Sequence, residues 1–158
     1  PCEICSRPDA AANGCHRDAS GALTMRGVLG SRSAVILDLD GDGDLDIVTN
    51  EFNAGPQVLI SDLSGRGMLH ALGVRLRGTT SNRQGIGAEV TVVLPDGRRL
   101  LRPVDGRSGY LSQSDLPLYF GLGTATEAGS IEVRWPSGKR QTVPGPLRSG
   151  SISEIVEP

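Results

Sequence analysis

The second half of the chain is dominated by short runs in which hydrophobic and polar residues alternate. In GVRLRG, Val74 and Leu76 alternate with Arg75 and Arg77, which is the period of two expected of a half-buried β-strand. The same alternation recurs in AEVTVVL, PLYFGLG and SIEVRWP, separated by turn sequences such as PDG at 95–97 and PSG at 136–138. The pattern predicts a mostly β fold, an antiparallel β-sandwich. Its expected core is one set of inward residues: Val74, Leu76, Val90, Val92, Leu94, Phe120, Leu122, Ile131, Val133 and Trp135.

Shorter strand-like segments precede this region and surround an acidic loop. AVIL enters the loop, LDIVTNEF leaves it, and PQVLISD follows a turn at 53–55. Residues 1–30 are small, polar and glycine-rich, with at most a short helix from Asp9 to Gly14. We therefore expect three parts: a cysteine-containing segment at 1–30, a single hairpin unit with the acidic loop at 31–65, and the sandwich at 66–158.

Composition narrows the class of protein. The 22 glycines and 10 prolines among 158 residues suit short strands joined by turns. A net charge of −2 argues against nucleic-acid or membrane-surface binding, and no apolar run reaches the roughly 20 residues of a membrane span. Because the chain begins at Pro1 rather than Met, we expect a processed or excised product.

The most specific motif is DLDGDGDLD, which places five carboxylates within nine residues. Such crowded like charge favours a hard divalent cation, and Ca²⁺ prefers about six to eight oxygen ligands. We expect a calcium site with side-chain ligands Asp38, Asp40, Asp42 and Asp46, and with Asp44 supplying its main-chain carbonyl while its side chain points outward or binds through water. Mg²⁺ fits less well because it demands stricter octahedral geometry. The alternative is a solvated acidic turn without metal.

An EF-hand does not explain this loop. The EF-hand requires a bidentate Glu at position 12, where this chain has Thr49, and β-rich sequence flanks the loop instead of helices. A dockerin-like loop fails for the same reasons.

All three cysteines, Cys2, Cys5 and Cys15, lie in the first fifteen residues. A haem-attachment motif is excluded because Ser6, not His, follows Cys5. A zinc site that used the cysteines and His16 would have two adjacent ligands, unlike usual zinc spacings. The favoured interpretation is one disulfide closing onto Cys15, with the third thiol free or bonded to another chain.

The sequence favours a non-catalytic protein. No Gly-x-Ser-x-Gly elbow accompanies the serines of GRSGYLSQSD, and GIGA at 85–88 lacks the third glycine of a dinucleotide-binding loop. Serines beside an aspartate are more often turn residues than nucleophiles. The residues considered and set aside as catalytic candidates are Ser108, Ser112, Ser114, Asp115, His16 and His70.

Arginines accumulate between residues 66 and 107. Arg75 and Arg77 share one strand face, and Arg98 and Arg102 share another. They are either a solvated outer sheet face or a patch for an anionic glycan or acidic partner. Nucleic acid is disfavoured because no aromatic platform accompanies them.

Two segments resemble known families. SAVILDLDGDGDLDIVTNEFNAGPQVLI resembles an FG-GAP/VCBS-type repeat, the calcium-loop blade of integrin-like β-propellers. The stretch from about Leu72 to Val143 is similar to the ASPIC/UnbV domain through the landmarks RLRG, SNRQGIGA, GYLSQSD, FGLG and VRWPSGKRQ. Together the resemblances imply a secreted, extracellular protein of the cartilage-acidic-protein type, associated with matrix, adhesion and calcium binding.

A closed propeller needs about four to eight blades, whereas this chain carries one such repeat. We therefore expect a structural or adhesion module that works as a subunit of a larger assembly or filament, with other copies of itself or other extracellular proteins as partners, and glycans as further ligands. Nucleic acid and membrane insertion are not expected. The alternatives are the C-terminal part of a multi-blade propeller that recognises glycan or protein, and a small enzyme of glycan or secondary-metabolite chemistry.

Overall fold

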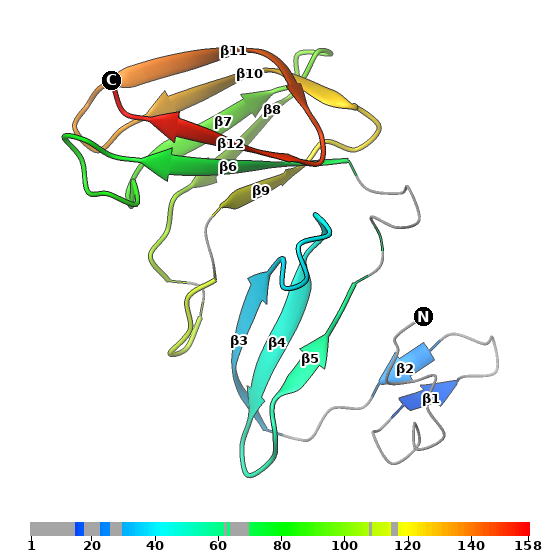
Figure 1. The fold of residues 1–158 in the computed structure, drawn as a ribbon. Helices are drawn as coiled ribbons and strands as arrows, with labels where there is room; N and C mark the ends of the chain where they lie inside the picture. Colours follow the sequence, from blue (N-terminus) through cyan, green and yellow to red (C-terminus); the bar gives the residue numbers. More distant parts are fainter. Residues whose placement is uncertain are drawn as a thin grey trace.

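The computed structural model describes residues 15–17, 23–25, 30–61, 63, 70–107, 109–114 and 117–158. Within these ranges the regular structure consists of twelve strands, and no helix is present (Figure 1). Accordingly, the described residues include no helix able to span a membrane.

Two sheets form a sandwich from the second half of the chain. One sheet has the order β11-β10-β7-β8 and the other the order β12-β6-β9. The strands of the first are β7 (Glu89–Val93), β8 (Arg99–Pro103), β10 (Glu127–Arg134) and β11 (Arg140–Arg148). Those of the second are β6 (Ala71–Arg77), β9 (Leu118–Gly121) and β12 (Ser151–Val156). The predicted mostly β, sandwich-like fold is confirmed.

A single apolar core lies between the two sheets. All ten predicted core residues are buried in it, joined by others such as Leu72, Val104 and Ile155. Trp135 is only 2% exposed, and its indole N–H donates a hydrogen bond to Gln141 Oε1 at 3.0 Å. The alternation of each strand therefore predicted correctly which side chains face inward.

One strand pair differs from the antiparallel expectation. β12 pairs parallel with β6, with Ser151 opposite Leu72 and Val156 opposite Arg77. The chain crosses from one sheet to the other at a turn in which Gly150 has φ 73° and donates its N–H to Ala71 O at 2.7 Å. The period of two determines which face a residue occupies but carries no information on strand direction.

The acidic loop belongs to a separate three-stranded antiparallel sheet of order β3-β4-β5. Its strands are β3 (Ser31–Leu37), β4 (Asp46–Glu51) and β5 (Gln57–Leu59). Among residues 30–61 and 63, the buried side chains are the carboxylates of Asp44, Asp46 and Glu51. Glu51 accepts hydrogen bonds from Ser31 Oγ at 2.8 Å and Thr49 Oγ1 at 2.6 Å. This sheet therefore has no buried apolar side chain of its own in the described part.

Near the N-terminus, β1 (Cys15–Arg17) pairs antiparallel with β2 (Leu23–Met25), a hairpin that the sequence pattern did not predict. Three-residue strands are too short for an alternation to be recognised. The proposed helix at 9–14, Cys2, Cys5 and the Cys15 side chain lie outside the described residues. The disulfide and the domain boundaries remain predictions.

Candidate functional site

The loop that joins β3 to β4 is closed at its base by the pairing of Leu37 with Asp46. Gly41 and Gly43 adopt φ values of 81° and 91°, a left-handed conformation that glycine tolerates best. Asp38 accepts both of their N–H groups, at 2.8 Å for Gly41 and 3.1 Å for Gly43. Asp40 and Asp42 each accept an N–H from two residues further on, at 3.3 and 3.0 Å. The loop is thus a series of turns in which alternate aspartates bind the backbone.

This curl brings three of the predicted ligands together. Carboxylate oxygens of Asp38, Asp40 and Asp42 lie within 4.8 Å of one another, and the latter two side chains are exposed. The pKa of Asp40 is raised, first by desolvation and then by repulsion from the neighbouring aspartates, against the opposing hydrogen bond from Asp42 N–H. The cluster is therefore a concentration of like charge open to solvent on one side.

Asp44 and Asp46 are oriented differently from the other three. Both are 1% exposed, so of the two arrangements expected for the Asp44 side chain, outward or bound to the ion through water, the outward one is excluded. Asp44 Oδ2 accepts the N–H of Leu63 at 2.8 Å, and the two oxygens of Asp46 accept those of Ser61 and Leu39, each at 2.8 Å. A buried carboxylate needs such donors, and here they tie the loop to the segment that follows β5. The sequence could not reveal this role, because the donors are backbone amides.

The convergent carboxylates suit a calcium ion. Ca²⁺ takes hard oxygen ligands, and the three clustered aspartates offer only such atoms. Each carboxylate has about four lone-pair directions, so accepting one or two backbone hydrogen bonds leaves others available to an ion. The donor set and its exposure therefore fit the metal that the sequence predicts.

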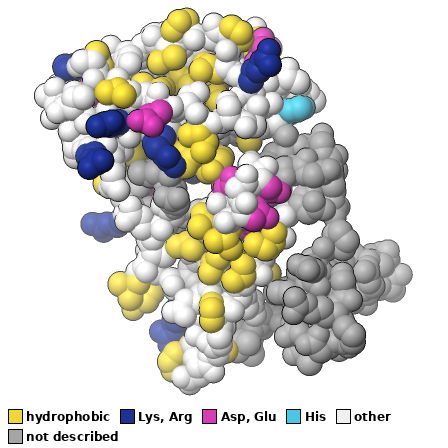
Figure 2. Space-filling model, in the orientation of Figure 1, with side chains coloured by type: hydrophobic (Ala, Val, Ile, Leu, Met, Phe, Trp, Pro, Cys, Tyr) yellow, Lys and Arg dark blue, Asp and Glu magenta, His cyan; other side chains and the backbone are white. Residues whose placement is uncertain are grey.

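The loop also lies against the sandwich. Tyr119 Oη donates a hydrogen bond to Asp38 Oδ2 at 3.4 Å, and Ile36 N–H donates one to Ser114 Oγ at 3.2 Å. A small cavity of about 140 Å³ separates the loop from the outward side of β6 and the start of β12, where Gly73 and Ser151 line it. Figure 2 shows the acidic side chains gathered where the three-stranded sheet meets the sandwich. A change in the loop would thus be transmitted to the sandwich directly.

The four arginines of the predicted patch do not form one surface. Arg75 and Arg77 line a cavity beside β6, whereas Arg98 lies in the turn before β8 and pairs with Asp96 at 2.6 Å. Arg102 donates a hydrogen bond to Tyr119 O at 2.9 Å and lines a different cavity. The predicted patch is split into separate sites because β6, which carries Arg75 and Arg77, and β8, which carries Arg102, belong to different sheets. Instead Arg83 lines the cavity together with Arg75 and Arg77. The sequence pattern did not predict this residue, although its position in the landmark SNRQGIGA could have pointed to it.

The residues considered as catalytic candidates either lie apart from one another or fall outside the described residues. Ser108, Asp115 and the His16 side chain are outside the described residues. His70 Nδ1 lies 3.4 Å from Ser149 Oγ, and Ser114 binds the backbone of β3. Among the described residues, His70 therefore has a hydrogen-bond contact with Ser149 and none with Ser112 or Ser114.

The architecture defines the class: an all-β module in which a two-sheet sandwich is joined to a small sheet with an acidic loop. The family described as "ASPIC and UnbV" matches residues 78–157, which include most of the sandwich. The chain belongs to this family.

Among curated proteins, the chain is similar to cartilage acidic protein 1 of Homo sapiens, 34% identical over 126 residues, and of Mus musculus, 36% identical over 126 residues. The protein of the same name from Xenopus tropicalis is 32% identical over 122 residues. These alignments cover 78%, 78% and 77% of this chain but 18%, 19% and 18% of the relatives, so the chain spans about a fifth of their length.

Proposed function

We propose that this chain is an extracellular, non-catalytic structural or adhesion module stabilised by Ca²⁺. Its relatives carry the name cartilage acidic protein, and cartilage is a tissue rich in extracellular matrix, which supports an extracellular location. The segment at 31–65 is proposed to be an FG-GAP/VCBS-type repeat, on the residues of its acidic loop. When calcium is bound, this repeat would stabilise the sandwich that it contacts.

The observation that carries the proposal is the convergence of Asp38, Asp40 and Asp42, whose carboxylate oxygens lie within 4.8 Å of one another. These side chains would hold the ion, with the main-chain oxygen of Asp44 as a further ligand. Asp46 and the Asp44 carboxylate would keep the loop in shape through their backbone hydrogen bonds. Bound Ca²⁺ would cancel the repulsion within the loop and so hold β3 and β4 together.

The proposal predicts that Ca²⁺ raises the melting temperature of the protein and that this increase requires the Asp42 side chain. A ligand at a hundred times its Kd stabilises the folded state by about 2.7 kcal/mol, enough to raise the melting temperature by several degrees. In calcium, Asp42→Ala should melt near the temperature of the chelated wild type, because one ligand of the ion is lost. Calorimetric titration with Ca²⁺ and thermal melts with and without chelator measure both effects.

A matched control is Glu127→Gln, which removes an exposed carboxylate at the start of β10 that is neither part of the acidic loop nor a lining residue of its cavity. It should retain wild-type calcium affinity and the full response to chelator. The proposal is wrong if chelator leaves wild-type melting unchanged and the titration shows no saturable heat.

A further inference from the structure

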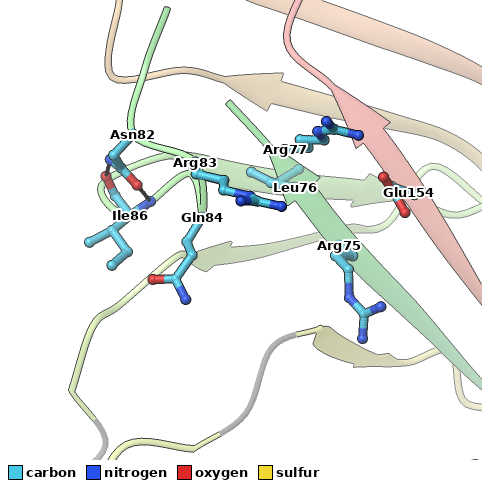
Figure 3. Close-up of a pocket in the computed structure, with 8 residues that line it drawn as sticks. All are labelled: Arg75, Leu76, Arg77, Asn82, Arg83, Gln84, Ile86 and Glu154. Carbon is cyan, nitrogen blue, oxygen red and sulfur yellow. Dashed lines mark hydrogen bonds between the residues drawn. The ribbon is translucent and has the colours of Figure 1, made fainter. Parts of the chain in front are cut away.

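A cavity of about 780 Å³ lies beside β6, where the loop at 78–88 folds over the end of the strand. Three arginines line it: Arg75 and Arg77 on β6, and Arg83 on the loop. Figure 3 shows Arg83 extending from the loop toward β6, with Glu154 on the neighbouring strand β12. The cavity is thus built from three segments, two of them in the same sheet.

The charge of this lining is predominantly positive. Within the described part of the chain, Arg77 and Arg83 have no side-chain hydrogen bond or ion pair, in contrast to arginines such as Arg99 and Arg134, which pair with glutamates. Glu154 stands opposite Arg75 in the parallel register of β12 and β6. Two guanidinium groups therefore retain their donors for a ligand.

The loop that supplies Arg83 is held in a defined conformation. Asn82 exchanges two hydrogen bonds with the backbone of Ile86, both at 2.8 Å, and Gly78 N–H donates to Arg83 O at 3.1 Å. The carboxylate of Glu157 binds the backbone N–H groups of residues 79–81 at 2.7–2.9 Å. A preformed wall avoids the entropy that ordering a loop on binding would cost.

We propose that this cavity binds a segment of an anionic polysaccharide through its sulfate or carboxylate groups. Guanidinium groups bind both anions with paired hydrogen bonds, and Arg77 and Arg83 are the donors that the geometry offers. Gln84 and Glu154 can bind sugar hydroxyl groups. The volume falls in the range of about 300–1,000 Å³ that is usual for small-molecule sites.

The lining argues against other anionic partners. Single-stranded nucleic acid binds by stacking its bases on aromatic side chains, and the lining residues include none. A peptide partner is usually anchored by aromatic side chains packed in an apolar pocket, whereas this lining has no aromatic residue and two apolar ones, Leu76 and Ile86. An open cavity lined mainly by charged and amide residues matches a polyhydroxylated anion best.

This inference does not depend on the calcium proposal. Along the outward row of β6, Gly73 borders the acidic-loop cavity and Arg75 and Arg77 border the basic one, so the two cavities are separate. Binding assays in calcium and in chelator therefore distinguish failure of one proposal from failure of the other.

The test measures binding of a heparin-derived tetrasaccharide to the full 158-residue chain by calorimetric titration. Saturable binding that weakens with salt is expected. Arg77→Gln and Arg83→Gln should each raise Kd about tenfold, because each loses a charged hydrogen-bond donor. Glu154→Gln should lower Kd about threefold, because it removes the negative charge of the lining.

The matched control is Arg98→Gln, which changes the net charge equally but lies outside the cavity. This variant should bind the tetrasaccharide with the same Kd as the wild type. A hyaluronan oligosaccharide, which has carboxylates but no sulfates, shows whether the cavity prefers sulfate or carboxylate. Equal weakening by Arg98→Gln would mean unspecific charge attraction and overturn the proposal. Absence of tetrasaccharide binding would also overturn the proposal. Equally tight binding of poly-glutamate would overturn it too, because it would indicate a site for acidic peptides. Melting curves establish that each variant is folded.

Discussion

The carboxylate of Glu157 is 3% exposed and lies at the centre of a dense hydrogen-bond network. It accepts the N–H groups of Thr79, Thr80 and Ser81, and the hydroxyls of Ser81 and Ser137 at 2.9 and 2.5 Å. Burial by itself would raise its pKa, but the bonds from Ser137 and from the loop outweigh it and lower the pKa from 4.5 to about 2. The ionised side chain therefore holds together the end of the chain and the loop that carries Arg83.

Glu157→Gln should destabilise the protein in a pH-dependent way. Because the pKa is lowered on folding, the contribution of Glu157 is complete above about pH 4.5 and is lost as the pH falls toward about 2. The difference in melting temperature between the wild type and Glu157→Gln should be largest at neutral pH and shrink over this range. Melts at several pH values measure it, with Glu127→Gln as the control for an exposed glutamate. A difference that is constant from pH 7 to about pH 2 would contradict this role.

At the scale of elements, the loop at 78–88 begins with a glycine that has no room for a side chain. A Cβ at Gly78 would overlap the carbonyl oxygens of Ser81 and Asn82, although the backbone there is not in the left-handed region. These carbonyls cannot move without breaking the turn, since Asn82 O accepts the N–H of Gly85 at 2.9 Å. Glycine is therefore required here by space.

Gly78→Ala should lower the free energy of unfolding by about 1–3 kcal/mol, the usual cost of overpacking. It should also weaken binding at the basic cavity, because Asn82 and Arg83 would shift. Gly121→Ala is the matched control: its Cβ would meet no atom within 4 Å, so stability should change by less than about 0.5 kcal/mol. Urea denaturation compares the two, and equal losses would show that the loop tolerates the side chain.

At the scale of the whole molecule, the two halves of the structure differ in burial. Every buried apolar side chain that the structure describes lies between Leu72 and Ile155, in the sandwich. In the three-stranded sheet and the loops at its ends, by contrast, no described hydrophobic side chain is buried, and some are visible in Figure 2 below the acidic loop. Several large hydrophobic residues of this part are exposed. They are Ile36, Leu39, Leu45, Ile47, Phe52, Ile60 and Leu63, each 36–55% exposed. No described strand pairs with the outer edges of β3 and β5, although Ile36 N–H on β3 donates to Ser114 Oγ. The remaining edge groups favour pairing with another chain.

We propose that further copies of this chain cover this sheet. Sedimentation in calcium should show species larger than the monomer, and Ile47→Arg should dissociate them, because it places a charge on the exposed apolar surface. Leu101→Arg, at a 61% exposed position on β8, should not. Runs with and without reductant separate contacts through the three cysteines from contacts through the sheet. A monodisperse monomer under both conditions would contradict the proposal.

Local sequence patterns predicted much of the fold and part of the site. Alternation identified Val90, Val92 and Ile131 as core residues, since neighbouring side chains on a strand must point to opposite faces. The PDG turn led correctly to the β7–β8 hairpin, with Gly97 at φ 87°. The spacing of Asp38, Asp40 and Asp42 likewise predicted their convergence, because it depends only on the curl of one short loop.

Contacts between segments distant in sequence were decided by the tertiary structure alone. Asp44 turned inward because the segment after β5 offered it the N–H of Leu63, and β12 ran parallel to β6 because the chain crosses between sheets at Gly150. Glu157 binds Thr79, 78 residues away. A periodic pattern determines where a side chain points relative to its neighbours in sequence. Which strand, loop or backbone amide lies opposite depends on how whole segments pack, and that information is spread over the entire chain.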